Sequence, residues 1–107
     1  MVIFMKTLTI LVACGSGIAT ASLAEMRLRE EFERRKIPLK TIKGKSFDIH
    51  SLIDQNKPDI IITTAVMTQE ELHTTAPVFS GVPLLYGQGK AQFFKELFET
   101  VEKLTKE

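Results

Sequence analysis

The sequence has a single cysteine, no tryptophan and almost no net charge. Its 107 residues include 14 lysines and arginines against 13 aspartates and glutamates, which leaves a formal net charge of +1. The basic residues are scattered, whereas nucleic-acid binding needs lysines and arginines clustered on one face. A lone cysteine can form neither an internal disulfide nor a cysteine-rich zinc site. The composition therefore argues against a nucleic-acid partner and is typical of a reducing compartment.

Long hydrophobic runs are also missing. No apolar stretch approaches the roughly 20 residues that a membrane-spanning helix needs. Residues 1–6, MVIFMK, have no charged leader before their apolar positions, unlike a secretory signal. Hydrophobic residues make up 44% of the chain and charged residues 25%, which suits one hydrophobic core. We therefore expect a single domain over residues 1–107, cytoplasmic and without a segment inserted in the membrane.

The most informative stretch is residues 7–20, TLTILVACGSGIAT. It begins with an aliphatic run typical of a strand buried on both faces, and residues 14–17, CGSG, interrupt that run. From Ile18 onward a stretch without Pro or Gly predicts a helix. Glycines allow several backbone N–H groups to face one concavity, and a helix start adds unpaired N–H groups and a positive partial charge. The pattern predicts a phosphate cradle that begins at Cys14.

The remaining hydrophobic pattern predicts an α/β fold. Strands are expected over residues 7–13, 39–43, 59–64 and 81–86, and helices over residues 18–36, 48–56 and 90–104. Asp48 is expected to cap the second helix, and residues 65–80 to form a functional loop with one helical turn near residues 69–72. Two lysines in the second strand and Pro83 in the fourth are signs of edge strands.

These edge signals fix the order of the strands. We predict a four-stranded parallel open sheet of order 2-1-3-4 with helices on both faces, a Rossmann-like or flavodoxin-like three-layer sandwich. In such sheets ligands bind beyond the carboxyl ends of the strands, where the winding reverses, which is here between the first and third strands. Cys14 directly follows the first strand as the first residue of the loop, and Thr63 and Thr64 end the third strand. Topology and motif therefore select the same place.

The sequence resembles the cytoplasmic IIB components of bacterial sugar phosphotransferase systems, most closely the galactitol-type group. The resemblance covers nearly the whole chain. It rests on residues 12–20 (VACGSGIAT), with support from residues 63–65 (TTA) and 87–89 (GQG). The family pattern often continues after the threonine with Ser and then Thr or Leu, whereas this chain has Ala21 and Ser22.

The resemblance implies a role for each part of the motif. Cys14 would accept a phosphoryl group from a histidine of the IIA component and pass it to a sugar or polyol, galactitol in this group, held by the membrane IIC component. The loop backbone would bind the phosphate at Gly15, Ser16, Gly17, Ile18, Ala19 and Thr20. No metal or other cofactor is expected, because loop amides can stabilise the equatorial oxygens of the phosphoryl group. They should also lower the pKa of an exposed Cys14 thiol.

Other interpretations compete with this one. A lone cysteine is often only a small buried hydrophobe. Low-molecular-weight tyrosine phosphatases also begin a phosphate loop with a cysteine, but they place an arginine six positions later, where this chain has Thr20. No Lys, Arg or His lies between Ala13 and Met26. A nucleotide-binding or redox module has less support, because GSG is a weak signal and there is no second cysteine. His50 and His73 could carry phosphate, but lone histidines are more often surface residues.

Overall fold

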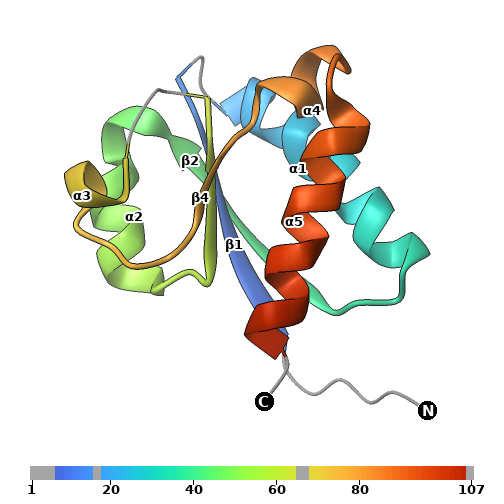
Figure 1. Ribbon diagram of the computed structural model, residues 1–107. Coiled ribbons are helices and arrows are strands. Elements are labelled where there is room, and N and C mark those ends of the chain that lie inside the picture. Colours follow the sequence, from blue (N-terminus) through green and yellow to red (C-terminus); the bar gives the residue numbers. More distant parts are fainter. Residues whose placement is uncertain (1–6, 16–17, 65–67, 106–107) are drawn as a thin grey trace.

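The protein folds as one four-stranded parallel sheet with helices on both faces, as the sequence predicts. The computed structural model describes residues 7–15, 18–64 and 68–105 (Figure 1). The elements are β1 (Leu8–Cys14), α1 (Ile18–Arg34), β2 (Leu39–Lys45), the short 3-10 helix η1 (Ser46–Asp48), α2 (Ile49–Asn56), β3 (Ile60–Thr63), α3 (Gln69–Leu72), β4 (Val78–Ser80), α4 (Val82–Tyr86) and α5 (Lys90–Thr105). The strand order is β2-β1-β3-β4, and each neighbouring pair is parallel.

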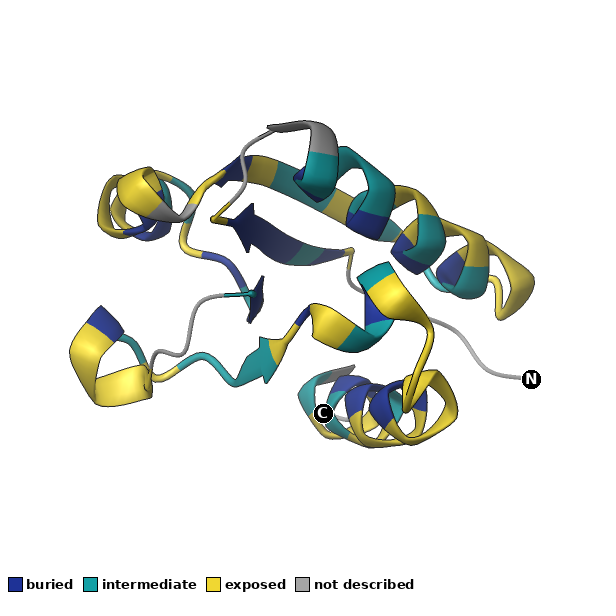
Figure 2. Ribbon diagram, turned by 90° about the horizontal axis from the view of Figure 1, so that it is seen from above, coloured by how far each residue is buried: buried dark blue, intermediate teal, exposed yellow. Residues whose placement is uncertain are grey.

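The sheet separates two hydrophobic cores. Helices α1, α4 and α5 cover one face, and α2 and α3 cover the other (Figure 2). Successive strand residues point to opposite faces. From β1, for example, Val12 and Cys14 belong to the core beneath α1 and α5, whereas Leu11 and Ala13 belong to the core beneath α2. Because both faces of β1 and β3 are covered, their largely apolar sequences are what the fold requires.

The predicted fourth strand is wrong. Residues 82–86 form α4, and the strand that pairs with β3 is Val78–Ser80, inside the segment expected to be a loop. Pro83 lies in the first turn of α4, where a helix needs no backbone N–H donor. Leu84 is buried while Val82 and Tyr86 are exposed, so this apolar run is one-sided. A three-residue strand is too short to give a hydrophobic pattern, but it does occupy the predicted edge.

The other predicted helices are confirmed, with small differences at their ends. Helix α1 ends at Arg34. The expected turn near residues 69–72 is α3, whose N-terminus is capped by a capping box between Thr68 and Glu71. Asp48 stands at the N-cap of α2, but its side chain makes no capping hydrogen bond. In the part of the chain that the structure describes, no helix is long and apolar enough to cross a membrane.

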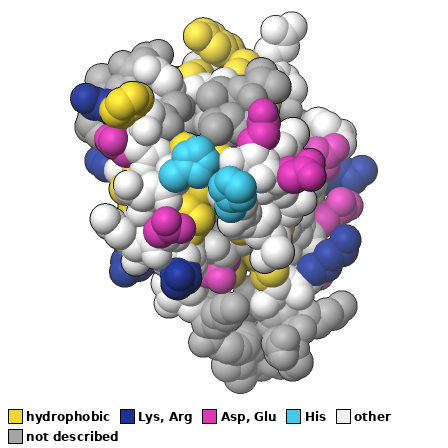
Figure 3. Space-filling view, turned by 90° about the vertical axis from the view of Figure 1, so that its left-hand side faces the viewer, with side chains coloured by type: hydrophobic (Ala, Val, Ile, Leu, Met, Phe, Trp, Pro, Cys, Tyr) yellow, Lys and Arg dark blue, Asp and Glu magenta, His cyan; other side chains and the backbone are white. Residues whose placement is uncertain are grey.

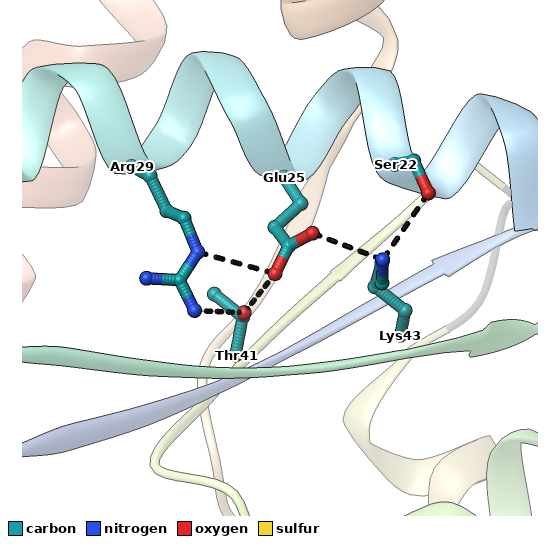
Figure 4. A network of polar contacts seen from close by, with 5 residues as sticks. All are labelled: Ser22, Glu25, Arg29, Thr41 and Lys43. Atoms are coloured by element: carbon teal, nitrogen blue, oxygen red, sulfur yellow. Dashed lines mark hydrogen bonds and ion pairs between the residues drawn. The ribbon is translucent and has the colours of Figure 1, made fainter.

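Helix α1 is fixed to the edge strand β2 by a polar network (Figure 4). The Glu25 carboxylate accepts a hydrogen bond from Thr41 and lies 3.2 Å from both Arg29 Nε and Lys43 Nζ. Burial alone would raise the pKa of Glu25, but these hydrogen bonds and the positive charge of Lys43 outweigh it and lower the pKa. The network therefore holds α1, the helix that follows the cysteine loop, at a defined position over β2.

Candidate functional site

Cys14 is the last residue of β1, at the carboxyl edge of the sheet, as predicted. Its neighbour in β2 is Lys45, and on the other side the register pairs Ala13 with Thr63, which brings Thr64 beside Cys14. Only 1% of Cys14 is exposed, and its side chain belongs to the core beneath α1. The expectation of an exposed nucleophile is therefore wrong, because a side chain at this point of β1 faces the core that α1 covers.

Thr64 connects the cysteine to the start of the loop. Its hydroxyl oxygen accepts a hydrogen bond from the Gly15 backbone N–H at 3.1 Å, and the same hydroxyl is hydrogen-bonded to the Cys14 side chain. The Thr64 backbone N–H donates to the Ala13 carbonyl oxygen at 3.2 Å, which continues the β1–β3 pairing. With its oxygen accepting from Gly15, the hydroxyl is free to donate its own proton to the sulfur.

Burial decides the ionisation of the thiol. It raises the pKa of Cys14 above the ordinary value, and the hydrogen bond to Thr64, which favours the thiolate, lowers the pKa by a smaller amount. The predicted lowering of the pKa is therefore wrong in direction. The resting side chain is a protonated thiol at neutral pH, whose hydroxyl partner becomes a stronger contact once negative charge develops on sulfur.

The structure covers only part of the predicted phosphate loop. Gly15 is exposed, and Ile18, Ala19 and Thr20 form the start of α1, whereas Ser16 and Gly17 lie outside the described residues. The first turn of α1 contains no acidic residue that would oppose an anion. The cradle formed by residues 15–20 therefore stays a prediction.

No arginine takes the position that a phosphatase would need. Thr20 is half-buried in the first turn of α1. Arg27, farther along α1, is occupied elsewhere, because its Nη1 donates to the carbonyl oxygens of Leu84 and Leu85 at 2.6 and 3.1 Å. These carbonyls lie near the end of α4, so Arg27 joins α1 to α4. The cation nearest to Cys14 in the sheet is instead Lys45, across the β1–β2 pairing.

The sequence placed Thr64 at this edge of the sheet without giving it a contact to Cys14, and Lys45 was missed as a member of the site. The residues that follow Cys14 along the chain contain no cation up to Met26. Lys45 ends β2 and Thr64 follows β3, so both approach Cys14 only through strand pairing. The predicted strand order held enough information to find Lys45 as well, because the carboxyl ends of neighbouring parallel strands meet at one edge.

The two histidines lie together on another face of the molecule. The rings of His50, on α2, and His73, after α3, have their centroids 6.1 Å apart, and they are the adjacent cyan side chains in Figure 3. His50 Nε2 lies 3.1 Å from the Glu71 carbonyl oxygen, which connects α2 to α3. Helices α2 and α3 cover the sheet face opposite to the Cys14 side chain. Among the described residues, no group of three or more His, Cys, Asp or Glu could hold a metal ion.

Comparison with known proteins identifies the family. A search of curated proteins finds no match. A family model described as the lactose/cellobiose-specific IIB subunit of the PTS system matches residues 9–95, which is well over half of the chain and includes Cys14 and the whole sheet from Thr9 onward. That description names lactose and cellobiose, whereas the sequence resemblance suggested galactitol. The chain belongs to the PTS IIB family, whose members serve as phosphotransferase components in sugar phosphorylation.

Proposed function

We propose that Cys14 is the phosphoryl carrier of this IIB component. It accepts the group from a phosphohistidine of a IIA component and passes it to a sugar or polyol held by a membrane IIC component. The observation that carries the proposal is the position of the chain's one cysteine, at the carboxyl end of β1 and directly before the loop and α1. This position lies inside the family match.

The first transfer is a substitution at phosphorus. The Cys14 sulfur forms a bond to phosphorus while the bond between phosphorus and the histidine nitrogen of IIA breaks. The thiol starts protonated, so its proton must leave, and the released imidazole nitrogen is the base that gains it. As negative charge develops on sulfur, the Thr64 hydroxyl donates a hydrogen bond to it. No external acid or base is therefore required.

The second transfer reverses these roles. A hydroxyl oxygen of the sugar attacks phosphorus, the bond between sulfur and phosphorus breaks, and the hydroxyl proton balances the charge left on Cys14. The Thr64 hydroxyl again stabilises the sulfur as it leaves. The same hydroxyl holds the Gly15 N–H, so the start of the loop and the sulfur stay aligned in both steps.

Exposed apolar side chains at the same edge of the sheet support protein partners. Phe47, in η1 after β2, is 92% exposed, and Tyr86, in α4 after β4, is 76% exposed. Both follow the carboxyl ends of edge strands, and Cys14 lies at the end of β1 between those strands. Large exposed apolar groups are common in protein interfaces. A buried thiol flanked by such groups suits transfer between proteins better than transfer to a free solute.

A hydrolase like the low-molecular-weight tyrosine phosphatases is the alternative function, and it has less support. The family match points to the phosphotransferase system, and Thr20 stands where such a phosphatase has arginine. Losing that guanidinium should cost on the order of a thousandfold in rate. The protein should therefore hydrolyse p-nitrophenyl phosphate poorly, and fast turnover that depends on Cys14 would favour the phosphatase.

The identity of the sugar or polyol that receives the phosphoryl group is a separate question from the reaction. The sequence resemblance favours galactitol, and the family description names lactose and cellobiose. We propose galactitol as the first substrate to test, with lactose and cellobiose beside it. The assay is phosphorylation of each labelled sugar by this protein together with its IIA and IIC components.

The carrier role is tested by incubating the protein with a phosphorylated IIA component and locating the adduct by mass spectrometry. We expect one phosphoryl group on Cys14 and none in Cys14→Ser. As matched controls, His50→Gln and His73→Gln should accept phosphate like the unchanged protein, since both histidines lie over the opposite face of the sheet. Phosphate transfer through Cys14→Ser, or an adduct on either histidine, would contradict the proposal.

A further inference from the structure

Strand β2 directs alternate side chains toward α1. Thr41 bonds to Glu25 and accepts a hydrogen bond from Arg29 at 3.0 Å, and both partners lie on α1. Two residues later, Lys43 Nζ lies 3.2 Å from the Ser22 hydroxyl and 3.2 Å from the Glu25 carboxylate, one turn closer to the start of α1 (Figure 4). Because side chains alternate along a strand, Lys45 shares the face of Thr41 and Lys43.

The position of Lys45 in this row brings it next to Cys14. The β1–β2 register pairs Val12 with Lys43 and Cys14 with Lys45. Paired residues of neighbouring strands lie on the same face, and adjacent strands are about 4.8 Å apart. Lys45 therefore lies one step farther along β2 than Lys43, on the side of the sheet toward which Cys14 points.

The two lysines differ in how their charges are used. Lys43 is neutralised by Glu25, whose carboxylate it contacts. Lys45 is exposed, and among the described residues no hydrogen bond or ion pair engages its side chain. An ammonium that has no partner among these residues, on the strand position paired with Cys14, is available to an incoming anion. A phosphoryl group on Cys14 would be such an anion, and the residues that follow Cys14 up to Met26 include no Lys, Arg or His.

We propose that Lys45 is the cation that contacts the phosphoryl group carried by Cys14. This inference rests on the proposed function. Lysine supplies a point charge on a flexible chain, whereas arginine grips two phosphate oxygens in a fixed fork. An ammonium can follow the phosphoryl group as it arrives from one protein and leaves to another. Lys45 thus takes the charge-neutralising part of the arginine in a phosphatase, but from a neighbouring strand instead of the loop.

The test compares Lys45→Met and Lys45→Arg with the unchanged protein and with Lys40→Met. Lys40 is an exposed lysine of the same strand, but it pairs with Thr9, near the other end of β1. Each protein is phosphorylated by phosphorylated IIA, and the phosphocysteine is titrated by phosphorus NMR. We expect Lys45→Met to raise the pKa of the phosphoryl group, because the dianion loses its cation. The pKa of the phosphoryl group in Lys45→Arg and in Lys40→Met should equal that in the unchanged protein.

The rate of transfer gives a second measure. A charge-assisted contact to the phosphoryl oxygens predicts that Lys45→Met accepts phosphate about 10- to 100-fold more slowly at saturating phosphorylated IIA. Folding is not a concern, because substitutions of exposed lysines change stability little, and a thermal melt checks this. A slower transfer with an unchanged phosphorus titration would mean that Lys45 only helps IIA to dock, and it would overturn the inference.

The two proposals fail in different ways. If the unchanged protein gains no phosphate on Cys14, the carrier role is wrong. If it does, but Lys45→Met titrates and transfers like the unchanged protein, the carrier role stands and the assignment of Lys45 is wrong.

Discussion

Replacing Thr64 with valine removes a hydroxyl while keeping the shape of the side chain. That hydroxyl lowers the pKa of Cys14 by favouring the thiolate, and so it partly offsets the rise in pKa that burial causes. A hydrogen bond to a charged group is worth about 1.5–3 kcal/mol. At 1.36 kcal/mol for each pKa unit, its loss should reduce the thiolate fraction at neutral pH by roughly 10- to 150-fold. We therefore expect the pKa of Cys14 to rise further in Thr64→Val.

The assay is the rate of alkylation by iodoacetamide as a function of pH. In the unchanged protein the midpoint should lie above that of a free cysteine, because burial raises the pKa. Thr64→Val should shift the profile to higher pH, so that alkylation at a fixed neutral pH is slower. Thr64→Ser keeps the hydroxyl and is the matched control, expected to remain close to the unchanged protein.

Two results would refute this reasoning. A midpoint at or below that of a free cysteine in the unchanged protein would mean that burial does not control the ionisation of Cys14. An identical profile for Thr64→Val and the unchanged protein would mean that the hydroxyl does not act on the sulfur. In the second case Thr64 would serve only the Gly15 backbone, which it also contacts at 3.1 Å.

Two further predictions concern the partner surface and the response to acid. Phe47→Ala should raise the Kd for IIA in a titration and leave the thermal midpoint unchanged, because the side chain is 92% exposed. The control is Met26→Ala, at a half-exposed methionine of α1. Equal affinities of Phe47→Ala and the unchanged protein would exclude Phe47 from the interface. Because the fold lowers the pKa of Glu25, its stabilisation is complete above its ordinary pKa of about 4.3 and is lost as pH falls through the lowered value. Glu25→Gln should therefore have a lower free energy of unfolding at neutral pH in denaturant titrations, and this free energy should fall less steeply below pH ~4.3 than in the unchanged protein. Free energies of unfolding that fall in parallel with pH in the two proteins would contradict this sign.

The order of the strands was predictable because it depends on local signals. Buried strands such as β1 and β3 are rich in aliphatic residues, and the lysines of β2 are typical of an edge. The predicted fourth strand, residues 81–86, is instead mostly helix α4, and this difference also has a physical cause. Residues 82–86 are apolar enough for a strand, but a proline fits the first turn of a helix, and Arg27 secures the carbonyl oxygens at Leu84 and Leu85. That last contact comes from a distant part of the chain.

The motif at Cys14 located the candidate site but not its chemistry. The ionisation of a thiol depends on what surrounds it, and here the surroundings are the core beneath α1 and the hydroxyl of Thr64. Neither is visible in residues 14–20. From the sequence, the helix start was expected to lower the pKa of Cys14, whereas burial of the side chain raises it. The structure reverses that balance because β1 delivers the side chain to a covered face of the sheet.

A raised thiol pKa is compatible with a phosphoryl carrier, because the carrier must be both a nucleophile and a leaving group. A thiolate that is fully stable in the resting protein would be a good leaving group, but a weaker nucleophile and an easy target for oxidation. A buried, protonated Cys14 avoids oxidation while it waits. The stabilising groups then act where charge appears: the Thr64 hydroxyl on the sulfur, and the Lys45 ammonium, as proposed, on the phosphoryl oxygens. The site would thus favour the transition state of transfer over the resting thiolate, which is the condition for speeding the step in both directions.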